Sequence, residues 1–167
     1  LKPYEYSELL DYVDAIRNSY WVHTEFNFEG DVQDYKVNTT PAEKTVIKRT
    51  MLAIAQIEVQ VKTFWADIYE EMPKPEVGNV GMTFAESEVR HMDAYSHLLD
   101  VLGITDDFEK VTEEPAIKQR IEYLDEYLDK GEADDKQENV MSLLLFSTFV
   151  EHVSLFSQFL IMTSFDK

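Results

Sequence analysis

Three side chains that could take part in metal or redox chemistry follow one another at helical spacing in the segment 84–95. Glu88 and His91 are three residues apart and Tyr95 lies four beyond His91, so on a helix a carboxylate, an imidazole and a phenol share one face. The rest of that face is apolar or small: Gly81, Phe84, Met92 and Leu98. The opposite face carries polar residues: Glu86, Arg90, Asp93 and His97. The chemical face is therefore predicted to point into the core.

A glutamate that faces the core needs a partner, because a buried unpaired carboxylate is costly and a cation is one of the few groups that relieve it. Glu-x-x-His directed inward is half of a ligand set with which helix bundles hold two metal ions. The alternative is a surface Glu88 and a satisfied core His91 that share a turn by chance. Tyr95 would then be a packed tyrosine with its hydroxyl hydrogen-bonded.

Two further glutamates are candidate ligands on other predicted helices. Glu58 interrupts an apolar stripe made of Val46, Ile47, Met51, Ile54, Val61 and Trp65, and an ordinary surface pair with Lys62 is its alternative interpretation. Glu151 lies on a small polar stripe of a very apolar helix, where a solvated or interface face is the alternative. His152 points nearer to apolar residues and is expected to be a core histidine.

Long helices are predicted to position these residues. The expected helices cover residues 3–18, 40–72, 76–102, 115–130 and 138–165, with an irregular acidic segment before 38 and an acidic connection over 105–114. Thr40, Pro41 and Glu43 form a strong helix start, and Gly103 fits a helix stop. The last helix is apolar nearly all round and is expected to be central. No β pattern is present, so the predicted class is all-α.

Composition narrows the choice of function. A net charge of −18 disfavours nucleic acid and anionic membrane surfaces as partners. The absence of cysteine excludes disulfides, thiolate metal sites and a cysteine nucleophile within these residues, and it is compatible with a cytoplasmic protein. The apolar run near 141–162 is broken by Glu151, His152 and several serines, so a buried helix is expected rather than a membrane span.

The chain resembles the small, radical-generating subunit of class I ribonucleotide reductase, a member of the ferritin-like superfamily. The resemblance covers nearly all of the 167 residues and rests on Trp21, the segment 40–44, Glu58 and the blocks 84–99 and 149–159. It implies a single ferritin-like helical bundle over residues 1–167. It also implies that Glu58, Glu88, His91 and Glu151 are metal ligands, with Glu88 as the bridging carboxylate.

The resemblance gives the remaining site residues redox roles. Tyr95 matches the tyrosine that becomes a stable radical, and Trp21 matches the tryptophan that relays the radical equivalent to the large subunit. Leu155 and Phe159 match the apolar wall of the radical pocket. The implied function is assembly of a dimetal–tyrosyl radical cofactor, which supplies the radical for reduction of ribonucleotides to deoxyribonucleotides on the large subunit.

The implied cofactor is a dinuclear centre, with Fe/Fe favoured and Mn/Mn or Mn/Fe as alternatives, because the ligands are carboxylates and imidazole without sulfur. The implied partners are a second copy in a homodimer and the large (alpha) subunit. A flavoprotein activator is implied for a manganese-dependent form. No nucleic acid and no membrane partner is expected, and the expected location is the cytoplasm.

The sequence departs from the family pattern in three places. Glu58 stands where many members have Asp. The second Glu-x-x-His, expected roughly thirty residues after Glu151, is not found within the 167 residues. The acidic partner of Trp21 and the C-terminal docking tail are missing with it. We therefore expect a truncated chain that holds four of six ligands and a weak or empty site.

Two other functions remain open on the sequence. Another dimetal-carboxylate oxidase of the ferritin-like superfamily would use the same ligands, but it has no need of a long-range relay through Trp21 and Tyr95. An acidic helical interaction domain without enzymatic activity would bind no metal and would tolerate replacement of Glu88.

Overall fold

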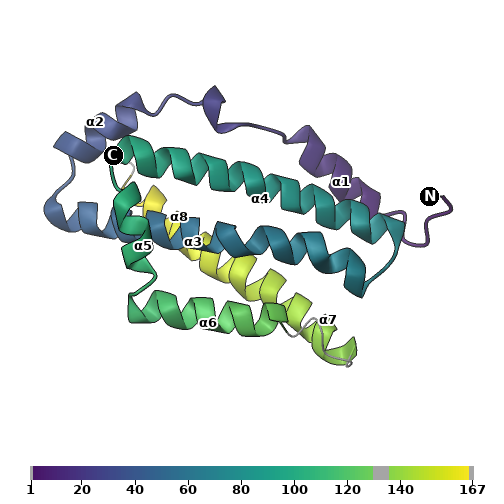
Figure 1. The fold of residues 1–167 in the computed structure, drawn as a ribbon. Helices are drawn as coiled ribbons and strands as arrows, with labels where there is room; N and C mark the ends of the chain where they lie inside the picture. The colour runs from purple at the N-terminus through teal and green to yellow at the C-terminus, as the bar shows by residue number, and fades with distance from the viewer. Residues whose placement is uncertain (1, 130–135, 166–167) are drawn as a thin grey trace.

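The computed structural model describes residues 2–129 and 136–165, and the regular structure of this part of the chain is helical (Figure 1). The elements are α1 (Leu9–Asn18), η1 (His23–Glu25), α2 (Glu29–Val37), α3 (Pro41–Glu71), α4 (Pro75–Leu102), η2 (Thr105–Asp107), α5 (Phe108–Val111), α6 (Pro115–Asp129), α7 (Lys136–Leu145), the π-helical segment η4 (Phe146–Ser154) and α8 (Leu155–Thr163). The predicted all-α class is confirmed. Residue 130, where the fourth predicted helix ends, lies outside the described residues.

The long helices α3 and α4 form the antiparallel pair at the centre of the fold (Figure 1). The start of α3 is a capping box, in which Thr40 Oγ1 accepts the Glu43 N–H at 3.3 Å and Glu43 Oε2 accepts the Thr40 N–H at 2.7 Å. α4 ends at Gly103, whose φ of 71° is left-handed. Both predicted boundaries are confirmed, and they set the register in which the two helices meet.

Two apolar clusters pack along the pair. One gathers buried residues around Met51, Leu52 and Leu99, and the other gathers Ile57, Val61 and Trp65 with Phe146 from η4. The predicted stripe of α3 is therefore buried, except for Val46, which is exposed because it lies at the edge of the stripe. Glu58 follows Ile57 in sequence and so lies next to the first α3 residue of the second cluster.

Gly81 lets α4 approach α3 closely. A Cβ built at this position would collide with the backbone carbonyl oxygen of Trp65 and with the side chain of Ile68. We expect Gly81→Ala to lower the free energy of unfolding by about 1–3 kcal/mol, because the helices must separate to admit the methyl group. Urea unfolding measures this. Gly30→Ala in α2 is the matched control, since nothing lies within 4 Å of its Cβ position and no loss is expected there.

The N-terminal region differs from the prediction. Helix α1 begins at Leu9 rather than near residue 3, because the N–H groups of Glu5 and Tyr6 donate to the buried carboxylate of Glu76 at 2.8 and 2.9 Å. The predicted irregular segment before 38 contains α2, whose sequence lacks an apolar stripe, and the predicted connection 105–114 contains η2 and α5. Short helices of this kind are held by tertiary contacts and leave little periodic signal.

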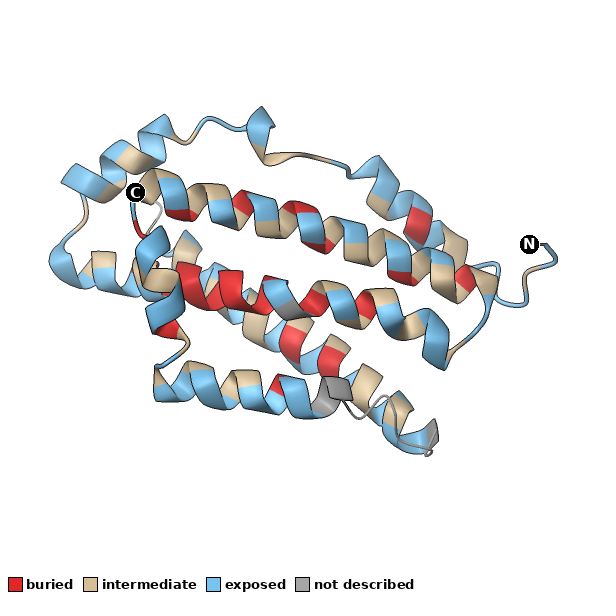
Figure 2. Ribbon diagram, in the orientation of Figure 1, coloured by how far each residue is buried: buried red, intermediate tan, exposed pale blue. Residues whose placement is uncertain are grey.

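The last helix is not central as predicted. Phe146 and Val150 pack against α3, but most large apolar residues of α7, η4 and α8 are exposed (Figure 2): Val140, Met141, Leu144, Phe149, Val153, Phe156, Phe159, Leu160 and Ile161. His152 is exposed rather than a core histidine, and its Nδ1 lies 2.7 Å from the Ser147 carbonyl oxygen. The prediction took the apolar composition of the helix as burial on all sides, whereas only one side faces α3.

The segment Gln137–Thr163 is long and apolar enough to cross a membrane by length and composition, and 11% of its most apolar window is buried. Its contacts are those of a bundle helix. Phe146 stacks on Phe64 of α3 with ring centroids 3.9 Å apart, and the half-buried Glu151 faces the same helix. The segment therefore packs against α3 in this structure.

Candidate metal centre

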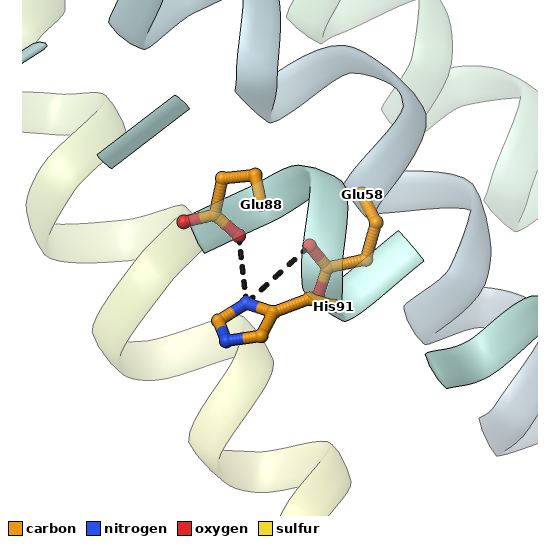
Figure 3. Close-up of side chains that lie close together, drawn as sticks. All are labelled: Glu58, Glu88 and His91. Atoms are coloured by element: carbon orange, nitrogen blue, oxygen red, sulfur yellow. Dashed lines mark hydrogen bonds and ion pairs between the residues drawn. The ribbon is translucent and has the colours of Figure 1, made fainter. Parts of the chain in front are cut away.

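Glu58 of α3 meets Glu88 and His91 of α4 at the middle of the helix pair (Figure 3). One potential ligand atom of each residue lies within 4.8 Å of those of the other two. His91 Nδ1 is 2.9 Å from Glu88 Oε2 and 4.0 Å from Glu58 Oε2. Both carboxylates are buried and the imidazole is half-buried. The helix pair thus brings three of the four sequence-predicted ligands to one point.

The environment of Glu58 disfavours a negative charge. Its side chain is 2% exposed, and its Oε2 has no hydrogen-bond partner within the described structure. Burial, a hydrogen bond with the Glu88 carboxyl group and the charges of Glu88 and Glu151 together raise the pKa of Glu58 to about 9. The surface-pair interpretation is wrong, because Glu58 is buried and Lys62 Nζ instead lies 3.2 Å from Met92 Sδ.

Glu151 reaches the same region from η4. Its Oε1 accepts the indole N–H of Trp65 at 3.2 Å. Burial and the charge of Glu88 raise the pKa of Glu151, the Trp65 hydrogen bond opposes this rise, and the resulting pKa is about 6. Glu151 is not in the group of donors that converge within 4.8 Å, so the fourth predicted ligand lies beside that group.

Removing the indole donor should change the titration of Glu151. We expect Trp65→Phe to raise the Glu151 pKa above about 6, because the lost hydrogen bond stabilises the carboxylate form. Carbon NMR of labelled glutamate carboxyl groups would report the midpoint in the metal-free protein. Trp21→Phe removes the other tryptophan of the chain and is the control that should leave this midpoint in place. An equal midpoint in wild type and Trp65→Phe would contradict the prediction.

Tyr95 lies one turn from His91 and is half-buried beside the cluster of Met51, Leu52 and Leu99. Burial raises the pKa of its phenol well above the ordinary value, and the charges of Glu58 and Glu88 raise it further. The phenol is therefore neutral at physiological pH, and it lies close enough to Glu58 and Glu88 for their charges to change its pKa.

The two predicted pocket residues lie on α8. Leu155 is half-buried, while Phe159 is 39% exposed and its ring lies edge-on to Phe156 with centroids 6.4 Å apart. Of the described residues of α8, Met162 is the one that packs against the apolar cluster that includes Tyr95. Helix α8 thus reaches the apolar cluster beside which Tyr95 lies through Met162.

Trp21 lies against the metal-ligand candidate His91. The indole and imidazole rings stack with centroids 5.8 Å apart and an interplanar angle of 23°. Trp21 is half-buried, and Phe26 meets the indole edge-on at 5.7 Å. Trp21 thus contacts a candidate metal ligand directly, although it lies 70 residues before His91 in the sequence.

Two residues of the site were missed in the sequence. Trp65 was assigned only to the apolar stripe, yet its N–H binds Glu151. Arg90 was placed on the solvent face of α4, yet it is 7% exposed and bonds to both Glu86 and the Trp21 carbonyl oxygen. The four-residue spacing of Glu86 and Arg90 was a usable signal for their pair. The contact with Trp21 depends on the path of the N-terminal segment.

The donors present fit a divalent cation. Glu58, Glu88 and Glu151 bring carboxyl oxygens to the same part of the helix bundle, and His91 offers an imidazole nitrogen. A bound cation would supply the missing partner of Glu58 Oε2 and relieve the cost of ionising these carboxylates. Carboxylate oxygens and imidazole nitrogen without sulfur suit iron or manganese.

Comparison with known proteins agrees with this site. Residues 1–167 match the family described as "Ribonucleotide reductase, small chain". The chain is 27% identical to the probable ribonucleoside-diphosphate reductase small subunit 048L of Invertebrate iridescent virus 3, over 99% of this chain and 48% of that protein. It is 28% identical to the probable small subunit 376L of Invertebrate iridescent virus 6, over 98% of this chain and 49% of that protein.

The chain spans about half the length of these curated relatives. The family match begins at the first residue of the chain and extends to the last. The chain therefore belongs to the ribonucleotide reductase small-chain family.

Proposed function

We propose that this protein is a radical-generating small subunit of ribonucleoside-diphosphate reductase. The observation that carries the proposal is the convergence of Glu58, Glu88 and His91, with Tyr95 one turn further along the same helix. Glu58, Glu88, His91 and Glu151 are the proposed metal ligands, with Glu88 as the shared carboxylate. An iron or manganese pair held there, once oxidised by dioxygen, would accept one electron from a nearby phenol.

The protein's own part is to hold the phenol neutral and shielded. Because burial raises the pKa of Tyr95, its Oη keeps its proton until an electron also leaves. The loss of one electron and one proton gives a neutral tyrosyl radical, which the apolar residues around Met51 and Leu99 shield from reductants. Leu155 and Phe159 are proposed to complete that shield.

Trp21 is the proposed relay between the centre and the large subunit. Its stacking on His91 supports this role, since an aromatic ring in contact with a metal ligand shortens the path for an electron. The proposed partners are a second copy in a homodimer and the large subunit, where ribonucleotide reduction takes place. A flavoprotein activator belongs to the proposal only for a manganese-dependent form.

The alternative within metal bundles is a dimetal-carboxylate oxidase. It would share Glu58, Glu88 and His91 but would gain nothing from an indole stacked on the ligand. An acidic interaction domain would not need two buried carboxylates, and Glu58 and Glu88 are 2% and 6% exposed. These observations favour the radical subunit over both alternatives.

The test uses the protein expressed from its full reading frame. It is loaded without oxygen with ferrous iron or, separately, manganous ions, its metal content is measured, and it is then exposed to air. We expect bound metal followed by an electron paramagnetic resonance signal of a tyrosyl radical in the iron sample. Metal binding without a radical in either sample would favour the oxidase. Failure to bind either metal would overturn the proposal.

A further inference from the structure

Arg90 joins the strand-like segment before η1 to the middle of α4. Its Nε donates to both carboxylate oxygens of Glu86 at 3.1 and 3.0 Å, and its Nη1 donates to the backbone oxygen of Trp21 at 3.1 Å. Its guanidinium carbon lies 4.4 Å from the centroid of the Tyr20 ring. The Arg90 side chain is 7% exposed, although its partners Glu86 and Tyr20 are themselves exposed. One guanidinium therefore holds two consecutive residues of a distant segment.

The segment that Arg90 holds has no regular structure of its own. Residues 20–22 lie between the end of α1 and the start of η1, and Val22 is the extended residue that precedes η1. Downstream, the His23 ring packs on His97 of α4 with centroids 5.2 Å apart. Upstream of that contact, Arg90 supplies a hydrogen bond from α4 to the backbone of Trp21 itself.

The neighbouring side chains explain why this hydrogen bond matters. Arg90 and His91 are adjacent in α4, and they contact the backbone and the ring of the same residue, Trp21. The hydrogen bond fixes the position of the Trp21 carbonyl group, and the ring then lies on the imidazole. We propose that Arg90 is a positioning residue that holds the Trp21 indole against His91.

Only a guanidinium can make all of these contacts together. Its planar fork directs separate N–H groups at Glu86 and at the Trp21 carbonyl while its face covers the Tyr20 ring. A lysine ammonium keeps the charge but presents a single nitrogen. The inference rests on the proposed function only in giving the held indole a redox task, and the contact itself can be tested in the metal-free protein.

The test follows Trp21 by fluorescence. The 167 residues contain two tryptophans, so Trp65→Phe leaves Trp21 as the single tryptophan among them, and excitation at the red edge of the tryptophan band avoids tyrosine emission. In that background we compare Arg90→Lys and Arg90→Met, with Arg17→Lys as the matched control at an exposed arginine of α1. The measurements are acrylamide quenching, the emission maximum and, separately, unfolding by circular dichroism. All are made in the presence of a chelator.

Loss of a hydrogen bond from a charged donor should raise the detached population of the segment about tenfold. Arg90→Lys and Arg90→Met should therefore increase quenching and shift the emission to the red at denaturant concentrations where the helices stay folded. Arg17→Lys should do neither. Unchanged quenching in both Arg90 variants would overturn the inference.

A milder pair covers the case in which Arg90 variants do not fold. Glu86→Gln removes the charge that orients the guanidinium, and Asp93→Asn removes a charge from an exposed residue of the same helix. Glu86→Gln should increase Trp21 quenching and Asp93→Asn should not. Equal quenching in these two proteins would count against a positioning role for Arg90.

The two proposals can fail separately. If Arg90 holds Trp21 in place but the protein forms no radical, the positioning role stands and the proposed function is removed.

Discussion

Replacing Tyr95 by phenylalanine is expected to abolish the tyrosyl radical signal while the metal content stays at the wild-type level. Phenylalanine keeps the ring that packs beside Met51 and Leu99 but removes the hydroxyl that must lose a proton and an electron. Electron paramagnetic resonance after aerobic loading, paired with elemental analysis of the same sample, gives both quantities. The expected effect is complete loss of the signal rather than a partial decrease.

The control for this experiment is Tyr35→Phe. Tyr35 is also half-buried against the same apolar cluster, but it lies on α2 and not on the helix pair that carries the metal-ligand candidates. This variant should retain the signal. A tyrosyl signal that persists in Tyr95→Phe would assign the radical to another tyrosine and would contradict the role proposed for Tyr95.

Replacing Glu58 by leucine is expected to stabilise the metal-free protein and to abolish metal binding. Exchange of buried charged groups for apolar groups of similar size is often stabilising by about 1–4 kcal/mol, and Glu58 is buried without a partner for Oε2. Urea unfolding in the presence of a chelator would measure the gain. Calorimetric titration with ferrous or manganous ions would measure the loss of binding.

The gain should depend on pH in a defined direction. The pKa of Glu58 is raised from 4.5 to about 9 in the folded protein, so the folded state favours the neutral carboxyl. The stability that this group contributes is fully present below pH 4.5 and is lost as the pH rises through about 9. The advantage of Glu58→Leu should therefore grow across that range.

Glu70→Leu serves as the matched control, because Glu70 is exposed on the same helix. It should show neither the growing advantage at high pH nor a loss of metal binding. A Glu58→Leu protein that is less stable than wild type throughout this pH range would contradict the burial cost assigned to Glu58.

The helix pair and its three convergent donors were predictable because local signals determine them. The Thr40 capping box fixes where α3 begins, Gly103 fixes where α4 ends, and the spacing of Glu88 and His91 fixes their common face. Two antiparallel helices of this length bring their midpoints together, and that places Glu58 opposite the pair.

The parts that were not predicted depend on contacts between distant segments. The burial of Arg90 requires Trp21, which is 69 residues away, and the hydrogen bond of Trp65 requires Glu151, which is 86 residues away. The exposure of the last helix shows a related limit. Apolar composition indicates that a surface tends to be covered, but it does not identify which neighbour covers it.

The uncovered apolar side of α7, η4 and α8 bears on the colloidal behaviour of this chain. A wide apolar surface attracts other copies of itself, while a net charge of −18 keeps those copies apart through long-range repulsion. Salt screens that repulsion, and acid near the isoelectric point of 4.4 removes it. The negative charge should therefore oppose association through the apolar side, and we expect this chain to stay dispersed at low ionic strength and neutral or alkaline pH.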